Sequence, residues 1–219
     1  MEHQRDIHEE SWDSRKPDRG TVMQKPRIKT TVSLLDNIVD DGDRVFDLGC
    51  GDGTMGLLLK EIRSVSIDGC DISKTAVNRA QDHYDDVHQI NIDENDLPVN
   101  SDAYDVVICT DVLEHTLSPR HALSEIQRIL KNEGIVVVSV PNFGFIRYRF
   151  NSIMGDIPRI LRDERHYSTF TRRSLQNILE KEDFQIRSVT GVSRLKRMAD
   201  IHPDLFGKTI IITAKIESE

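Results

Sequence analysis

An aspartate and a set of glycines stand close together near the start of the chain. Residues 45–53 read V-F-D-L-G-C-G-D-G, so Asp47 ends a short apolar run and a glycine-dense turn follows. Glycine allows a turn to bring bare backbone against a ligand at the start of a helix. Gly51, Gly53 and Gly56 also fit the G-x-G-x-x-G spacing of dinucleotide-binding loops. Asp47 opposes that interpretation, because its carboxylate would repel a pyrophosphate but attract a cationic ligand.

Acidic residues also follow the next two apolar runs. The first of these segments reads D-G-C-D-I-S, in which Asp71 comes 18 residues after Gly53. A carboxylate at that point can accept hydrogen bonds from both hydroxyl groups of a ribose, although Asp68 competes for this role. The second segment, N-I-D-E-N-D-L-P, contains Asp93 and Glu94. Three acidic segments thus follow three successive apolar runs.

These residues need a scaffold that brings successive strand ends together. Apolar runs bounded by turn residues predict strands at 44–48, 65–70, 87–92, 105–110, 135–140, 185–190 and 208–216. Helices are predicted after Pro26, over 54–62, from Ser73 as N-cap, over 119–130 with K-N-E-G as the stop, and over 171–182. The βαβ order predicts an α/β fold, Rossmann-like and doubly wound, with a mostly parallel seven-stranded sheet and an antiparallel edge strand. Ligands of such sheets lie across the carboxyl ends of the strands.

The segment V-F-D-L-G-C-G-D-G resembles motif I of the class I methyltransferases that use S-adenosylmethionine (SAM), written hh-D-L-G-C-G-x-G. SAM has no phosphate and carries a sulfonium and an ammonium group, so the resemblance explains the acid at Asp47. The resemblance covers roughly residues 28–190 and includes T-D-V-L-E-H and V-P-N. V-P-N-F-G and the R-Y-R-F that follows resemble the MetW-type branch. The E-H pair at Glu114 and His115 differs from the pattern of that branch.

The resemblance implies which residues hold the cofactor. Asp71 corresponds to the acid that binds the ribose, and Asp93 with Glu94 to the pair that holds the adenine. Thr110 and Asp111 would pass beneath the methionine part. The cofactor-binding residues implied in this way are Asp47, Gly49, Cys50, Gly51, Asp71, Ile72, Asp93, Glu94, Thr110 and Asp111.

Two histidines are candidates for the catalytic base that an oxygen acceptor needs. His115 follows the fourth predicted strand, and His166 lies in R-H-Y-S-T-F-T-R, which resembles the H-x-x-x-F-T of ubiquinone-type O-methyltransferases. An unperturbed imidazole has a pKa of about 6.5 and can accept a proton at neutral pH. Asp111, Glu114, His115 and His166 also resemble the E-x-x-E-H…H ligand set of metal-dependent RNA 2′-O-methyltransferases. A divalent metal is nevertheless not expected, since D-V-L-E-H also occurs in metal-free relatives.

Arginines gather in the segment after the fifth predicted strand. We expect residues 142–170 to form a small substrate-binding insertion, in which Arg147, Tyr148 and Arg149 contact the acceptor. Arginine without lysine favours bidentate contact with a carboxylate or phosphate, so the acceptor is expected to be anionic and either small or carrier-linked. The interleaved aromatic residues leave open a contact with a membrane surface, and a plain solvated basic face is the third interpretation.

Length, charge and cysteine content argue against several other classes of protein. The chain has 219 residues and a formal charge of −8, which argues against a chain devoted to binding nucleic acid. It contains no apolar run of membrane-spanning length and no signal peptide, so a cytoplasmic location is expected. The three cysteines fit neither a zinc site nor a disulfide framework. We expect an N-terminal arm or lid over 1–22, including Trp12, and one domain over 23–219; the oligomeric state is left open.

The sequence therefore predicts a SAM-dependent methyltransferase that acts on an oxygen atom. Three alternatives remain: a SAM-binding regulatory partner of the MetW type, a metal-dependent RNA 2′-O-methyltransferase, and a nicotinamide-dependent oxidoreductase. The last is disfavoured by Asp47 and by the V-P-N that ends the fifth strand.

Overall fold

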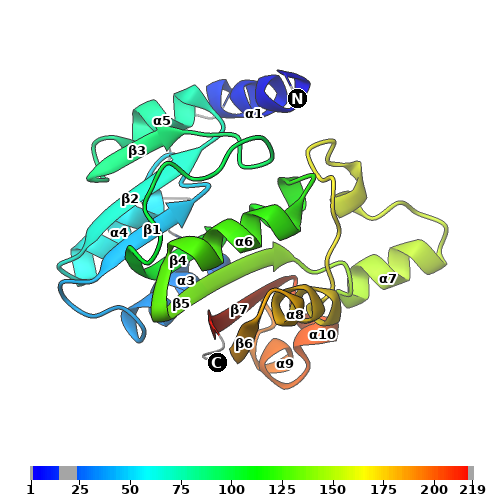
Figure 1. Ribbon diagram of the computed structural model, residues 1–219. Helices are drawn as coiled ribbons and strands as arrows, with labels where there is room; N and C mark the ends of the chain where they lie inside the picture. The colour runs from blue at the N-terminus through cyan, green and yellow to red at the C-terminus, as the bar shows by residue number, and fades with distance from the viewer. Residues whose placement is uncertain (1, 15–23, 217–219) are drawn as a thin grey trace.

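The computed structural model describes residues 2–14 and 24–216, which form a seven-stranded sheet covered by helices on both faces (Figure 1). The strands are β1 (Arg44–Leu48), β2 (Ser66–Asp71), β3 (Asp86–Gln89), β4 (Tyr104–Thr110), β5 (Leu130–Pro141), β6 (Phe184–Val192) and β7 (Thr209–Ile216). Their order in the sheet is β3-β2-β1-β4-β5-β7-β6. Strands β1 to β5 pair in parallel, whereas β7 runs antiparallel to both β5 and the edge strand β6. The predicted doubly wound sheet with an antiparallel edge is confirmed.

The helices are α1 (Glu2–Asp13), α3 (Pro26–Asp36), α4 (Thr54–Ile62), α5 (Lys74–Ala80), α6 (Pro119–Ile129), α7 (Ile146–Ile153), α8 (Arg172–Lys181), α9 (Lys196–Ile201) and α10 (Pro203–Phe206). Two short 3-10 helices, η1 (Leu113–His115) and η2 (Arg159–Arg162), lie between them. None of the helices within the described part of the chain is long and apolar enough to cross a membrane.

Alternate residues of the central strands pack into two separate cores. On β4, Val107 faces the core formed with α6 and α8, and Val106 faces the core formed with α3 and α4. A strand buried on both faces needs apolar residues at nearly every position, which explains why β4 reads as a continuous apolar run. The order of connection reverses between β1 and β4. The carboxyl ends of these two strands therefore border the crevice where ligands of such folds bind.

The boundary between α6 and β5 differs from the prediction. The helix ends at Ile129, and β5 begins at Leu130 without an intervening loop. K-N-E-G lies within the strand, because Leu130 already pairs with Tyr104 before the register shifts to Val106 opposite Ile135. Glu133 absorbs this irregularity with a φ of 66°.

Of the other local expectations, the starts of two helices agree with the structure and two further features do not. Ser73 caps α5 by accepting a hydrogen bond from the backbone nitrogen of Ala76, and Thr171 caps α8. The loop expected between β6 and β7 instead contains α9 and α10, and β3 is shorter than predicted. Of the N-terminal arm expected over 1–22, residues 2–13 form helix α1, whereas residues 1 and 15–22 lie outside the described residues.

Candidate active site

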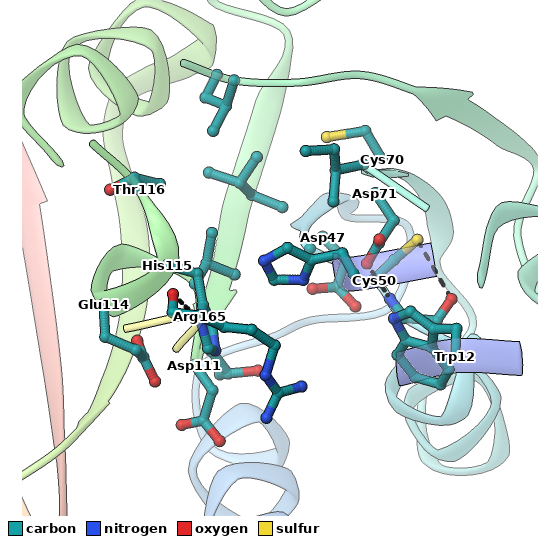
Figure 2. Close-up of a pocket in the computed structure, with 18 of the residues that line it drawn as sticks. Trp12, Asp47, Cys50, Cys70, Asp71, Asp111, Glu114, His115, Thr116 and Arg165 are labelled. Atoms are coloured by element: carbon teal, nitrogen blue, oxygen red, sulfur yellow. Dashed lines mark hydrogen bonds between the residues drawn. The ribbon is translucent and has the colours of Figure 1, made fainter. Parts of the chain in front are cut away.

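A cavity of about 700 Å³ lies at the carboxyl ends of the parallel strands. We call it the cofactor cavity. Figure 2 shows Trp12, Asp47, Cys50 and Asp71 on one side of it, and Asp111, Glu114, His115 and Arg165 on the other. Its wall includes nine of the ten residues that the sequence implied for the cofactor: Asp47, Gly49, Cys50, Gly51, Asp71, Ile72, Asp93, Thr110 and Asp111.

The turn after β1 requires glycine for two separate reasons. Gly49 and Gly51 have φ values of 76° and 56°, which side chains rarely adopt. A Cβ atom at Gly49 would also lie 2.3 Å from Cγ2 of Val112. The backbone nitrogens of Gly49 and Cys50 donate hydrogen bonds to the carbonyl oxygen of Cys70. The turn is therefore fixed against the end of β2, with its backbone presented to the cavity.

Asp71 connects this turn to the next helix. Its Oδ2 accepts a hydrogen bond of 3.0 Å from the nitrogen of Gly51, and its Oδ1 accepts one of 2.9 Å from the nitrogen of Ser73. These two bonds fix the orientation of a buried carboxylate at the edge of the cavity. Asp68, the competing acid, instead bonds the hydroxyl of Tyr104 and does not line the cavity.

Asp47 is almost completely buried beneath the turn. Its pKa is raised to about 7: burial raises it most, the hydrogen bond from Tyr84 lowers it, the neighbouring charge of Asp71 raises it and the charge of Arg27 lowers it. The Asp47 side chain therefore changes its charge near neutral pH. Ionised, it can stabilise a cation in the cavity.

The predicted adenine pair is only half in place. Asp93 lines the cavity, and its carboxylate accepts hydrogen bonds from Gln4, Leu117 and Ser118. Glu94 is exposed and does not line the cavity. It belongs to a turn in which its backbone nitrogen donates a hydrogen bond to the carbonyl of Asn91.

Asn91 is a cavity residue that the sequence reasoning missed. Its side chain is buried, and its Nδ2 has no hydrogen-bond partner among the described residues. The oxygen of the same amide accepts a hydrogen bond from the nitrogen of Asp93. A buried amide donor without a partner is costly, so a ligand atom that accepts from Asn91 would satisfy it. One indication of this role is present in the sequence, because Asn91 lies two residues before Asp93.

The two candidate bases lie side by side, with their ring centroids 4.8 Å apart. Nδ1 of His115 donates to the carbonyl of Arg165 at 2.9 Å, and Nδ1 of His166 donates to the carbonyl of Ile160 at 2.8 Å. In the neutral rings, Nε2 is then the proton acceptor. Burial lowers the pKa of His115, which favours its neutral form.

Glu114, His115 and His166 each place one potential metal-ligating atom within 4.8 Å of the others. Glu114 is fully buried, and burial together with the nearby charge of Asp111 raises its pKa well above the ordinary range. Asp111 adopts a φ of 56°, and its carboxylate is 2.9 Å from Nε of Arg27. Of the four residues that resemble a metal-ligand set, Glu114, His115 and His166 thus lie together, whereas Asp111 is paired with Arg27.

Helix α1 lies over the cofactor cavity. Gln4 donates hydrogen bonds to Asp93 and to the carbonyl of His115, and the ring of His8 packs edge-on against His115. The indole of Trp12 packs so closely on the turn that a Cβ at Gly51 would lie 2.8 Å from it. The helix therefore contacts three of the loops that form the cavity wall.

A second cavity of about 940 Å³ adjoins the first, and we name it the acceptor cavity after the role that we propose for it. The two share four wall residues, Asp111, Pro141, Arg165 and His166. Tyr148 lines the acceptor cavity as a member of the expected acceptor-binding set. Arg147 and Arg149 line neither cavity: Arg147 is exposed, and Arg149 donates a hydrogen bond to the carbonyl of Gly144.

The sheet order, the glycine turn and the strand-end acids together define a class I methyltransferase. The chain belongs to the methyltransferase domain family, whose family model matches residues 23–189. It is a SAM-dependent methyltransferase, and the oxidoreductase alternative is not supported.

Relatives with assigned functions include methyltransferases of two types. A ubiquinone biosynthesis O-methyltransferase of Acinetobacter baylyi is 27% identical over 160 residues, which cover 69% of this chain and 67% of that protein. A ubiquinone/menaquinone biosynthesis C-methyltransferase of Campylobacter jejuni is 26% identical over 155 residues, with 64% and 66% covered. The fold is also similar to that of magnesium protoporphyrin IX methyltransferase from Synechocystis, solved with bound S-adenosylhomocysteine (SAH). The TM-score is 0.64 at 20% identity, and the match covers 87% of this chain and 82% of that one.

Proposed function

We propose that this methyltransferase transfers the methyl group of SAM to an oxygen atom of a small or carrier-linked anionic acceptor. The observation that supports this most is the shared wall, which places the imidazole of His166 between the cofactor and acceptor cavities. Arg162 and Lys208 on the wall of the acceptor cavity can pair with a carboxylate or phosphate. Of the acids on the same wall, Asp111 and Asp163 are already ion-paired, whereas Glu10 and Glu164 would face the acceptor as negative charges. The relatives include an O-methyltransferase at 27% identity and a C-methyltransferase at 26%, so the choice of an oxygen acceptor rests on the histidine at the shared wall.

The reaction needs little beyond positioning and one proton transfer. SAM supplies an electrophilic methyl group bonded to a sulfonium. A hydroxyl oxygen of the acceptor forms the new bond to that carbon as the carbon–sulfur bond breaks, and the electron pair remains on sulfur. Nε2 of His166 accepts the hydroxyl proton. Orientation of two reactants in adjoining cavities contributes on the order of 7–11 kcal/mol in well-aligned reactions.

His115 has a different part in this arrangement, since it lines the cofactor cavity only. Its ring packs between His8 and His166, and its backbone belongs to η1. The backbone nitrogens of Tyr167 and Ser168 bond the carbonyl of Glu114, which holds the segment after His166 against η1. We therefore assign His166 as the base and His115 as the residue that positions it.

Helix α1 acts as the cover of the bound cofactor in this proposal. Gln4 is buried, and its Oε1 has no partner within the described part of the chain. That oxygen can accept a hydrogen bond from the amino group of adenine, while Asn91 donates to a ring nitrogen. Trp12 covers the opposite end of the cavity, above Gly51. In this proposal, the expected lid would supply these side chains to the bound cofactor.

The experiment uses [¹³C-methyl]SAM and a panel of hydroxylated carboxylic acids with their amino and unsubstituted analogues. Carbon NMR of the product distinguishes a methoxy group from an N- or C-methyl group. We expect methoxy products, a kcat that falls about 10²–10⁴-fold in His166→Ala, and SAH affinity that stays close to wild type. N- or C-methyl products, or an unchanged kcat in His166→Ala, would contradict the proposed reaction.

A further inference from the structure

The segment from α7 to η2, residues 146–162, exposes an unusual amount of apolar surface. Twelve large hydrophobic side chains are exposed among the described residues, and six of them fall in this segment. Ile153 is 81% exposed, Met154 66% and Phe150 61%, and α7 buries no residue. We call residues 146–162 the α7–η2 lobe. Figure 1 shows α7 projecting away from the sheet, so packing against the fold does not account for these side chains.

The charge of the lobe is opposite to that of the whole protein. Its sequence contains four arginines, no lysine and a single acidic residue, Asp156, in a chain with a formal charge of −8. Arg147 is exposed, and Arg149 donates to the carbonyl of Gly144 at the base of α7. Neither contributes to the cavities described above. The exposed apolar side chains of the lobe therefore belong to a segment of net positive charge, with Arg147 exposed on the same helix as Phe150 and Ile153.

The lobe is nevertheless continuous with the acceptor cavity. Tyr148 on α7, together with Ile160 and Arg162 at η2, lines that cavity, as does His166. An object that contacts the exposed side of the lobe would thus lie beside the mouth of the acceptor cavity.

We propose that the α7–η2 lobe docks on the surface of an anionic lipid bilayer. Exposed Phe, Ile and Met side chains can enter the boundary between headgroups and acyl chains, while arginines bind the phosphate groups. An acidic protein is repelled by an anionic membrane except through a local basic surface, so the charge distribution also sets the orientation of docking. Docking goes beyond the proposed methyl transfer and does not depend on it. It would open the acceptor cavity towards the lipid phase.

The test is flotation of the full chain with phosphatidylcholine vesicles and with vesicles that also contain phosphatidylglycerol. We expect binding to the mixed vesicles, weaker binding in high salt, and little binding to phosphatidylcholine alone. The double variant Phe150→Ser/Ile153→Ser should bind the mixed vesicles about tenfold more weakly or worse, because it removes two apolar groups from the contact. Arg147→Gln should weaken binding and reduce its dependence on salt.

Ile62→Ser is the matched control, because Ile62 is also exposed but lies at the end of α4, away from the lobe. It should bind the mixed vesicles like the wild type, and SAH affinity measured by calorimetry should be the same in all variants. Vesicle binding that survives the double variant would overturn the proposal. So would absence of vesicle binding together with a concentration-dependent dimer that Phe150→Ser/Ile153→Ser dissociates, which would make the lobe a contact between two copies of this chain.

Discussion

The hydroxyl of Tyr84 donates a hydrogen bond of 2.6 Å to Oδ2 of Asp47, deep beneath the glycine turn. The same hydroxyl accepts a hydrogen bond of 3.0 Å from the nitrogen of Gly56 in the first turn of α4. Tyr84 thus joins the acid at the end of β1 to the helix that begins after the turn. It is also the group whose hydrogen bond favours the ionised form of Asp47 against the effect of burial.

This contact predicts a pH-dependent affinity for the cofactor. With a pKa of about 7, Asp47 is mostly neutral at pH 6 and mostly ionised at pH 8. The cationic amino group of S-adenosylhomocysteine (SAH) binds the ionised form more tightly, so affinity should rise with pH and level off above pH 7. Calorimetric titration of SAH at several pH values measures this. Far below the pKa, the limiting slope is about tenfold per pH unit.

Two variants isolate the contribution of Asp47. Asp47→Asn should bind SAH weakly at every pH, with the rise near neutral pH removed. Tyr84→Phe removes the hydrogen bond that favours the ionised carboxylate, which raises the pKa of Asp47 further and moves the rise in affinity to higher pH. If Tyr84→Phe weakens SAH binding equally at all pH values, the tyrosine has only a structural role.

Asp71→Asn should lower SAH affinity by roughly ten- to a hundredfold, which corresponds to the loss of charge-assisted hydrogen bonds to a ribose. The variant retains a side-chain oxygen that can accept from Gly51 or Ser73, so thermal unfolding should show that it still folds. Asp68→Asn serves as the control, because Asp68 stands on the same strand and bonds Tyr104 instead. Equal losses in both variants would contradict a direct role for Asp71.

Trp12 is the only tryptophan of the chain, so its fluorescence reports on α1 directly. We expect its emission to change as SAH binds and to saturate at the stoichiometry found by calorimetry. Trp12→Phe should weaken SAH binding by up to about tenfold, since stacking and coverage by a smaller ring are reduced. An emission that stays constant while calorimetry shows saturation would argue against a cover over the cofactor.

A second variant examines how α1 is held. Thr75→Val removes the hydroxyl whose single proton is shared between the carboxylates of Glu9 and Asp13 on α1, and it leaves the wall of the cofactor cavity unchanged. It should weaken SAH binding less than Trp12→Phe does, because the remaining contacts of Gln4 with Asp93 and His115 still hold the helix.

Chelation should leave methyl transfer unchanged. Burial and the nearby charge of Asp111 raise the pKa of Glu114, and the carboxylate of Asp111 is already paired with Arg27, so this set offers a metal ion less free negative charge than two unpaired carboxylates would. Turnover before and after dialysis against EDTA measures the effect. A loss that Mg²⁺, Mn²⁺ or Zn²⁺ reverses would show that Glu114, His115 and His166 bind a metal ion in the working enzyme.

Local patterns explain which features were predictable. The glycine turn, the acids at the ends of β1 and β2 and the continuous apolar run of β4 are set by a few adjacent residues, and the structure agrees with each. The K-N-E-G segment was misjudged because pairing between Leu130 and Tyr104 on a neighbouring strand outweighs its turn composition. Tertiary contacts override local preference in such cases.

The remaining differences come from contacts between residues far apart in the chain. No sequence pattern links Gln4 to Asp93, or Tyr84 to Asp47, because these pairs depend on how loops from different strands meet. The arginines after β5 were expected to reach the acceptor. The segment is rich in arginine, as the sequence shows, but the direction of α7 places Arg147 outside both cavities.

The wall common to the two cavities also shows how the enzyme could be inhibited selectively. A single compound that joins an adenosine unit to a hydroxy-acid fragment by a short linker would pass Asp111 and His166 and occupy both spaces at once. Its second half would bind at the high effective concentration that linkage provides. The adenosine half would be common to many enzymes of this class, so selectivity would come from the residues around Tyr148 and Ile160.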